Sequence, residues 1–194
     1  EDTMANRKHR ANFDYEICRA ETHLDRMLES LEAAGKLVNT LVVVTSDNGT
    51  AIMVDGVRRG KASPYDFGVH EPLAMMWPAR IKPGRSVTDF VSFADFAPTF
   101  LEAAELEVPA SMTGRSLLRI LESDKSGRIE VERDFIVTGL EWHGEFDPES
   151  LSCRAIRDDR YAYVVRYANV DQQGRPLDNK ALIKPSHVEF YDLE

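Results

Sequence analysis

The most constraining feature of this sequence is the apolar run from Leu41 to Val44, which polar residues follow at once. A continuous run of β-branched side chains predicts a strand over 41–46 that is buried on both faces. The run stops at Asp47 and Asn48, and a glycine comes next. Because ligands bind outside the carboxyl ends of the strands in open α/β sheets, this pair predicts half of a binding site.

The segment before this strand predicts an amphipathic helix. From about Phe13 to Ala34 apolar residues recur at helical spacing, and charged residues occupy the other face, as in a helix packed on a sheet. Gly35 suits the position just after the helix. Residues 1–10 lack this periodicity, and we expect a loop there. Helix, short turn and buried strand form half of a βαβ unit, so the sequence predicts an α/β fold.

Further along the chain the pattern predicts more elements of the same kind and then changes. The first set is a strand at Pro72–Trp77, helices near Asp95–Ala104 and Ser116–Leu121, and a polar linker at Glu122–Arg133. Four short aromatic-rich segments follow, at Asp134–Gly139, Ser152–Arg157, Tyr161–Tyr167 and Val188–Tyr191. Their partial alternation predicts a small antiparallel sheet with a hairpin turn at Asp158–Arg160. We therefore expect two domains, residues 1–125 and a small α+β subdomain at 126–194.

Composition excludes several classes of protein. A net charge of −9, spread along the chain, argues against electrostatic binding of nucleic acid or of an anionic membrane. No apolar run is long enough to span a membrane. Cys18 and Cys153 are far apart and have no metal-ligand spacing, so we expect two ordinary structural thiols and no disulfide.

The side chains of Asp47 and Asn48 are both hard oxygen donors, which suit calcium or magnesium better than zinc or copper. Two ligands cannot complete a calcium shell of about six to eight oxygens, so other donors are required. Asp-Asn-Gly is also a common turn sequence, and taken alone the pair favours that interpretation.

Several motifs in order resemble the second half of the sulfatase family, and the resemblance covers nearly the whole chain. They are the segments 42–49, 60–61, 65–68, 71–73, 77–78, 81–84, 91–100, 112–117 and 190–193. Cys153–Arg157 and Thr138–His143 look closest to the N-sulfoglucosamine sulfohydrolase (heparan sulfamidase) branch. The resemblance implies that 1–125 is the C-terminal portion of an alkaline-phosphatase-like α/β domain, with a mixed sheet flanked by helices, and that 126–194 is the C-terminal subdomain with its antiparallel sheet.

The resemblance also implies roles for particular residues. Asp47 and Asn48 match the pair that coordinates the active-site Ca²⁺ of the family, and Lys61 matches a basic residue that contacts the sulfate group. His143 matches a position near the substrate pocket of the sulfamidase branch. His70 stands where many sulfatases carry an arginine, and we expect a structural role for it.

The nucleophile of the family has no counterpart here. Sulfatases use a cysteine, matured to formylglycine, within Cys-x-Pro/Ala-x-Arg, and neither Cys18 nor Cys153 lies in such a motif. The other calcium carboxylates of the family are also missing before Asp47. The expectation is a fragment of a hydrolase that cleaves sulfate esters or N-sulfates on sulfated sugars such as glycosaminoglycans, inactive as an isolated chain, with formylglycine in a missing N-terminal portion.

Two other functions stay open. A phosphatase, phosphonatase or phosphodiesterase of the same superfamily would commonly carry a histidine after the aspartate and bind zinc, and Asn48 argues against it. A non-catalytic fragment that binds a carbohydrate or a protein partner is the second alternative. We expect a sulfated saccharide as ligand, no nucleic acid, no membrane span, and homo-oligomers through an exposed sheet surface. By family analogy the compartment is periplasmic, secreted or lysosomal.

Overall fold

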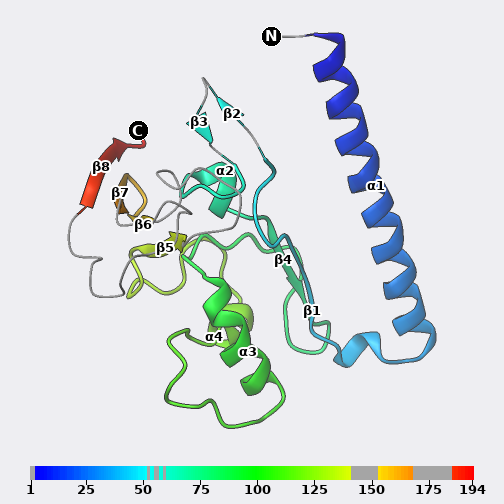
Figure 1. Cartoon of the computed structure of the whole chain (residues 1–194). Coiled ribbons are helices and arrows are strands. Elements are labelled where there is room, and N and C mark those ends of the chain that lie inside the picture. Colours follow the sequence, from blue (N-terminus) through cyan, green and yellow to red (C-terminus); the bar gives the residue numbers. More distant parts are fainter. Residues whose placement is uncertain (1–2, 52, 55–56, 59, 141–152, 168–184) are drawn as a thin grey trace. The chain divides into compact units, whose positions relative to one another are not determined.

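The computed structural model describes residues 3–51, 53–54, 57–58, 60–140, 153–167 and 185–194 (Figure 1). The chain divides into two compact units, residues 1–42 with 75–83 and residues 43–74 with 84–194. Helices and sheets are mixed along the chain, which confirms the predicted α/β class. The predicted domain boundary near residue 125 stays a prediction. Among the described residues no helix has the length and apolar character needed to cross a membrane.

The first unit contains the long helix α1 (Met4–Ala33) and the 3-10 turn η1 (Leu37–Asn39). Gly35 has φ +65° and ends α1 as predicted, while the backbone N–H of Lys36 donates to the carbonyl of Leu31 at 2.8 Å. The expected loop over 1–10 is wrong, because α1 begins at Met4. Residues 4–12 contain no glycine or proline and are mostly strong helix formers, although they lack an apolar stripe. Phe13 and Met27, on the predicted packing face, are 53% and 58% exposed.

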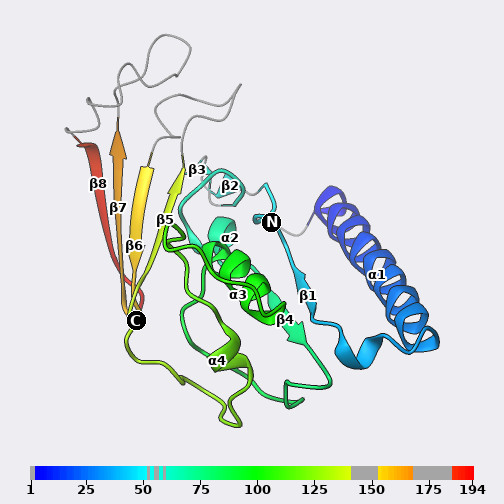
Figure 2. The same cartoon turned by 90° about the horizontal axis from the view of Figure 1, so that it is seen from below.

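Strands β1 (Val42–Thr45) and β4 (Leu73–Met76) form a two-stranded sheet (Figure 2), which confirms both predicted strands. The expectation that β1 is buried on both faces is wrong, since Val44 is 41% exposed. In the described part of the chain β1 has β4 as its one strand neighbour, so its side chains stay accessible to solvent. After β4 the indole Nε1 of the buried Trp77 donates to Oδ1 of Asn39 at 3.2 Å.

The helical part of the second unit follows the prediction closely. It contains η2 (Phe93–Asp95), α3 (Phe96–Ala103) and α4 (Leu118–Leu121). Asp95 is fully buried and joins these elements: its carboxylate accepts the backbone N–H groups of Ser92 and Arg115, both at 2.8 Å, and pairs with the guanidinium of Arg133. Burial raises the pKa of Asp95, but the bonds from Arg133, Arg115 and Ser92 outweigh burial and lower it.

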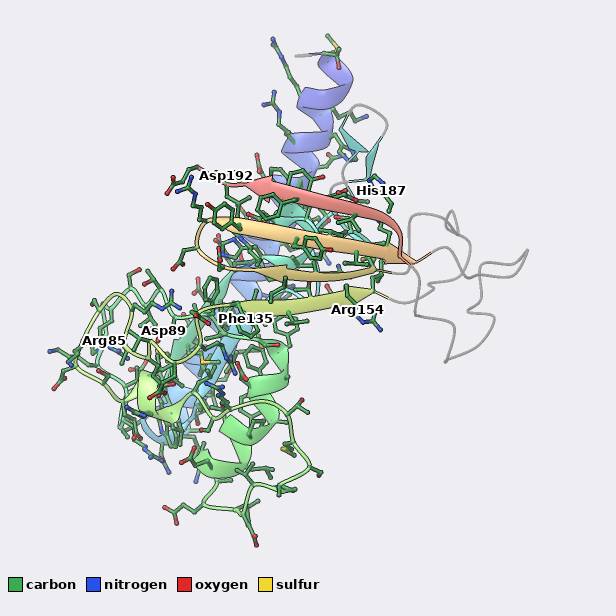
Figure 3. The ribbon with its side chains drawn as sticks, turned by 90° about the vertical axis from the view of Figure 1, so that its left-hand side faces the viewer. Arg85, Asp89, Phe135, Arg154, His187 and Asp192 are labelled. Atoms are coloured by element: carbon green, nitrogen blue, oxygen red, sulfur yellow. The ribbon has the colours of Figure 1, made fainter. Side chains whose placement is uncertain are left out.

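The polar linker at 122–133 is attached to the rest of this unit by side chains that come before it in the sequence. Arg85 donates to the carbonyls of Ile120 and Leu121, which end α4, and Asp89 accepts the backbone N–H of Ile129 at 2.8 Å. Figure 3 shows Arg85 and Asp89 on the same side of the C-terminal sheet. The linker therefore has a defined path.

The C-terminal sheet has four strands, which run β5 (Ile136–Leu140), β6 (Cys153–Arg157), β7 (Tyr161–Tyr167) and β8 (Pro185–Asp192). Neighbours are antiparallel in the order β5-β6-β7-β8 (Figure 2), which confirms the predicted sheet. The carboxylate of Asp158 accepts the backbone N–H of Arg160 at 2.8 Å and so closes the predicted hairpin turn. One face of the sheet buries Cys153, Ala155 and Val164 in a small core.

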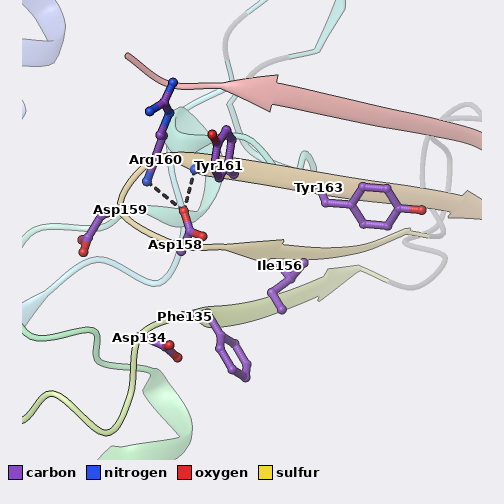
Figure 4. Close-up of a pocket in the computed structure, with 8 residues that line it drawn as sticks. All are labelled: Asp134, Phe135, Ile156, Asp158, Asp159, Arg160, Tyr161 and Tyr163. Carbon is purple, nitrogen blue, oxygen red and sulfur yellow. Dashed lines mark hydrogen bonds between the residues drawn. The ribbon is translucent and has the colours of Figure 1, made fainter.

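The opposite face, which we call the outer sheet face, presents apolar and aromatic side chains to solvent. Its members are Phe135, Val137, Ile156, Tyr161, Tyr163 and Phe190. The rings of Tyr161 and Phe190 stack with centroids 5.3 Å apart. A groove of about 410 Å³ lies over this face and also borders Asp134, Asp158 and Asp159 (Figure 4). Three carboxylates against the single cation Arg160 make this groove a poor receptor for sulfate.

Candidate functional site

The candidate site begins where β1 ends. Asp47 is exposed and Asn48 is half-buried. The Oδ1 atom of Asp47 accepts from the backbone N–H of Asn48 at 2.9 Å and from its Nδ2 at 3.2 Å, and the hydroxyl of Ser46 donates to the carbonyl of Asn48 at 2.9 Å. These bonds are those of a local turn. The turn nevertheless presents an accessible carboxylate and an amide side by side at the carboxyl end of a strand.

Two backbone hydrogen bonds join this turn to the segment that carries Lys61. The N–H of Gly49 donates to the carbonyl of Gly68 at 3.3 Å, and the N–H of Lys61 donates to the carbonyl of Thr50 at 2.8 Å. Residues 47–50 and 60–68 therefore lie side by side, although the hairpin of β2 (Met53–Val54) and β3 (Val57–Arg58) separates them in sequence.

The close approach of these two segments requires glycine. A Cβ atom on Gly49 would lie 1.7 Å from the carbonyl oxygen of Phe67. On Gly68 it would lie 2.5 Å from the carbonyl oxygen of Gly60. Both obstacles are backbone atoms, which cannot move away as a flexible side chain would. A larger residue at Gly49 would push the Lys61 segment away from the Asp47 turn, and one at Gly68 would distort the Lys61 segment itself.

The residue directly after Lys61 has a strained backbone conformation. Ala62 has φ +64°, a left-handed conformation that costs an L-residue about 1–2 kcal/mol. Ser63 and Pro64 are buried, and Lys61 is half-buried. The hydroxyl of Ser63 has no hydrogen-bond partner among the described residues. Strained residues of this kind are concentrated at functional sites, where the surrounding structure enforces them.

The donor set suits a hard divalent cation, but only in part. Among the described residues no group of three or more His, Cys, Asp or Glu side chains could hold a metal ion. Asp47 and Asn48 offer oxygen ligands of the type that Ca²⁺ prefers, against about six to eight in a complete shell. These residues fit two positions of a calcium site, and the other ligands would come from elsewhere.

The sequence analysis missed a cluster of side chains that holds the Lys61 segment. Tyr65 comes just before the short helix α2 (Asp66–Val69). Its hydroxyl donates to Oε2 of Glu189 at 2.7 Å and accepts from Nη2 of Arg166 at 2.8 Å. Nε of Arg166 also donates to Oε1 of Glu189 at 2.6 Å, and the hydroxyl of Tyr191 donates to the same carboxylate. We call Tyr65, Arg166, Glu189 and Tyr191 the tyrosine cluster.

Arg166 on β7 and Glu189 on β8 each stand between apolar residues, so both charged side chains face inward on neighbouring strands. Two opposite charges on the inner face of adjacent strands are the sequence signal that could have revealed the cluster. Burial raises the pKa of Glu189, but the hydrogen bonds from Tyr191, Tyr65 and Arg166 outweigh it and hold that pKa at about 2. Burial and the bond to Glu189 raise the pKa of Tyr65 well above its usual value. The cluster therefore joins an ionised carboxylate, a cation and the neutral phenol of Tyr65 across a wide pH range.

The remaining candidates have different outcomes. His143 lies outside the described residues, so its role stays a prediction. His70 is exposed, and its expected structural role is untested apart from the bond that its N–H donates to the carbonyl of Asp66 at 2.9 Å. Both cysteines are free thiols. Cys153 is fully buried, and burial raises its pKa, which makes it unreactive.

Comparison with known proteins assigns the class. The Sulfatase family model matches residues 1–106, and the model of the N-sulphoglucosamine sulphohydrolase C-terminal region matches residues 60–181. With the mixed α/β fold, these matches define the C-terminal region of a hydrolase of the alkaline-phosphatase-like superfamily. The chain belongs to the sulfatase family, as its resemblance indicated.

Curated relatives agree with this assignment. The uncharacterized sulfatase YdeN of Escherichia coli K12 is 30% identical over 172 residues, which is 85% of this chain and 29% of that protein. Arylsulfatase K of Xenopus laevis is 33% identical over 162 residues, 81% of this chain and 29% of that protein. An N-acetylglucosamine-6-O-sulfatase of Bacteroides thetaiotaomicron is 35% identical over 108 residues, 56% of this chain and 19% of that protein.

Solved structures match the fold over most of the chain. BT4656, solved in complex with its substrate D-glucosamine-2-N,6-O-disulfate, has a TM-score of 0.70 at 25% identity over 91% of this chain and 32% of that one. BT1596, a 2-O GAG sulfatase, has a TM-score of 0.62 at 25% identity over 89% of this chain and 33% of that one. The chain thus spans about a third of the length of these relatives.

Proposed function

We propose that this chain supplies part of the calcium and sulfate contacts of a sulfatase that acts on sulfated sugars. In this proposal Asp47 and Asn48 are two of the calcium ligands, and Lys61 binds a sulfate oxygen. The observation that carries the proposal is the pair of backbone bonds, Gly49 to Gly68 and Lys61 to Thr50, that join the two segments. The strain at Ala62 and the two obligatory glycines support it, because a mere surface loop needs neither.

The chemistry of these groups suits sulfuryl transfer. When bound, Ca²⁺ would draw negative charge from the oxygens of the sulfate group. The ammonium of Lys61 would pair with a non-bridging oxygen and stabilise the charge that develops there in the transition state. The half-buried position of Lys61 favours this role, because electrostatic interactions are stronger where water is partly excluded.

The proposed substrate is a sulfated amino sugar or a related sulfated saccharide. Support comes from the relatives, one an N-acetylglucosamine-6-O-sulfatase and one solved with a glucosamine disulfate. The match to the N-sulphoglucosamine sulphohydrolase C-terminal region also favours this class of sugar. His143, which lies outside the described residues, is our candidate for a contact with the sugar.

We propose further that these 194 residues do not turn over sulfate esters by themselves. The sequence has no Cys-x-Pro/Ala-x-Arg motif, and the buried Cys153 thiol has a raised pKa and no access to a substrate. The nucleophile would have to come from another segment of polypeptide.

The direct test measures calcium and sulfate binding by the 194-residue chain. Calorimetry should detect weak calcium binding, with a Kd of about 1 mM or weaker, because most of the shell is missing. Asp47→Ala should abolish it, whereas Asp159→Ala, an exposed carboxylate on a hairpin, should leave it unchanged. In NMR titrations sodium sulfate should shift the Lys61 resonances, and Lys61→Gln should remove the response.

Three results would contradict the proposal: tight calcium binding that survives Asp47→Ala, no response of Lys61 to sulfate, or turnover of an aryl sulfate by the isolated chain. Zinc binding at Asp47 in place of calcium would favour the phosphatase alternative.

A further inference from the structure

The tyrosine cluster ties the candidate site to the C-terminal sheet. Arg166 on β7 and Glu189 on β8 are well buried, with side chains 13% and 11% exposed. Both bind the hydroxyl of Tyr65, which comes only four residues after Lys61. The ring of Tyr65 also meets that of Tyr191 edge to face, with centroids 6.1 Å apart. One aromatic side chain is thus held by a buried ion pair and a second ring.

From Tyr65 the main chain leads to both halves of the candidate site. Toward the N-terminus, the buried Pro64 and Ser63 connect Tyr65 to Ala62 and Lys61. Toward the C-terminus, the carbonyl of Tyr65 accepts the N–H of Gly68 at 2.7 Å, and the carbonyl of Gly68 accepts the N–H of Gly49 at 3.3 Å. A displacement of Tyr65 would therefore shift both the backbone at Lys61 and the turn at Asp47.

A second contact joins the same segment to the same sheet. Nη1 of Arg157, on β6, donates to Oδ1 of Asp66 at 2.9 Å. This pair is more open to water, with Arg157 26% and Asp66 51% exposed, so we expect it to contribute less than the tyrosine cluster. Strand β6 thus contacts Asp66, the first residue of α2, and strands β7 and β8 contact Tyr65, the residue before it.

We propose that Tyr65, Arg166 and Glu189 are positioning residues that hold the Lys61 segment against the Asp47 turn, so that the C-terminal sheet sets the geometry of the sulfate site. The inference rests on the proposed function of Lys61 and deepens it. None of the three residues would touch the sulfate. They act through the backbone, by fixing where the ammonium of Lys61 and the turn at Asp47 lie relative to each other.

The test uses Tyr65→Phe, which removes one hydroxyl and keeps the ring. Amide hydrogen exchange at Gly49 and Lys61 should accelerate about tenfold, as expected for the loss of a hydrogen bond to charged partners. Sulfate titration followed at Lys61 should show a Kd raised about threefold or more. Amides of β6 and β7 that pair within the sheet should keep their protection, which shows that the sheet stays folded.

Tyr163→Phe is the matched control. Tyr163 lies on the same strand as Arg166 but on the outer sheet face, 40% exposed, so its hydroxyl cannot contribute to the Lys61 segment. This variant should exchange and bind sulfate like the wild type. Asp66→Asn is a second and milder variant, which should accelerate exchange at the same two amides about twofold, in keeping with its exposed ion pair.

The two readouts separate the two proposals. Unchanged exchange at Gly49 and Lys61 in Tyr65→Phe would overturn the positioning role, whatever the sulfate titration shows. Accelerated exchange with no sulfate response in the wild type would overturn the proposed function of Lys61, and with it the role of the cluster in sulfate binding. Faster exchange across the whole of β6 and β7 would show that Tyr65 only stabilises the fold, and would also overturn the positioning role.

Discussion

Ala62 is one of two non-glycine residues with a positive φ among the described residues, and it follows Lys61 directly. Relief of its left-handed strain is worth about 1–2 kcal/mol, whereas a glycine costs about 0.5–1 kcal/mol in added freedom of the unfolded chain. Ala62→Gly should therefore raise the free energy of unfolding by up to about 1.5 kcal/mol. Urea denaturation measures the change. Ala103→Gly, at the last residue of α3, is the control and should lower stability, by less than the roughly 1 kcal/mol expected in a helix interior. If the Ala62→Gly variant were less stable than the wild type, the claim that Ala62 is strained would be wrong.

Asp95 is the buried residue on which most polar contacts of the helical region converge. Asp95→Asn leaves the guanidinium of Arg133, whose side chain is 18% exposed, without its charged partner. Loss of one member of a buried pair costs about 3–5 kcal/mol, so we expect a large fall in thermal and urea stability. Asp159→Asn removes an ion pair whose carboxylate is 76% exposed and should cost less than about 1 kcal/mol. Equal losses in the two variants would show that Asp95 is not such a centre.

At this scale the sequence predicts what is local. Asp47 and Asn48 could be selected because they follow a predicted strand and match a sulfatase motif, and Lys61 because its own short motif resembles one of that family. The tyrosine cluster could not be predicted in this way. Tyr65 is 101 positions from Arg166 and 124 from Glu189, and no periodicity connects them. The sign of φ at Ala62 is equally invisible, because alanine gives no hint of a left-handed conformation.

The pairing of β7 with β8 brings Glu189 and Arg166 together, and it predicts how the sheet responds to acid. The pKa of Glu189 is about 2 in the folded chain against an ordinary value of 4.5. A lowered carboxyl pKa stabilises the fold above the unfolded value, and this stability is lost as pH falls through the folded value. The free energy of unfolding should therefore decline as pH falls from about 4.5 to about 2.

Glu189→Gln tests the assignment of this acid step. The variant should be about 1–3 kcal/mol less stable than the wild type at pH 7 and should show a weaker dependence on pH below 4.5. Glu194→Gln, whose side chain is 69% exposed in its pair with Arg160, is the control and should follow the wild type. If the free energy of unfolding of Glu189→Gln depended on pH below 4.5 as it does in the wild type, the loss of stability in acid would come from other carboxylates.

Elements with a clear period were predicted well, and their surroundings less well. The strands β1 and β4, the helices α3 and α4, and the whole C-terminal sheet follow the predicted segments. The start of α1 was wrong because helix propensity without an apolar stripe gives no periodic signal. The predicted burial of β1 was wrong because a run of valines only makes a strand suitable for burial. Whether the strand is buried depends on the elements that pack against it. Burial depends on the rest of the fold.

At the scale of the whole molecule, the apolar residues of the outer sheet face lead to a prediction about how the chain behaves in solution. Val137 is 55% exposed, Phe190 63% and Phe135 47%, and these side chains share one continuous surface with Ile156 and Tyr163. A broad exposed apolar surface favours association, because its burial against a second copy removes that area from water. The inner face of the same sheet is already packed, so the outer one is available.

We therefore predict that the 194-residue chain forms dimers or larger species at concentrations of about 10–100 μM, where exposed apolar surface commonly drives association. Val137→Lys should shift the equilibrium toward monomer, because a charge on this face would have to be desolvated in the contact. Val131→Lys is the matched control: Val131 is 75% exposed but lies outside the sheet, so the change should leave association as it is. Sedimentation velocity at several concentrations measures both. A wild-type chain that stays monomeric over this range, or a Val131→Lys variant that dissociates as readily as Val137→Lys, would show that the outer sheet face does not mediate self-association.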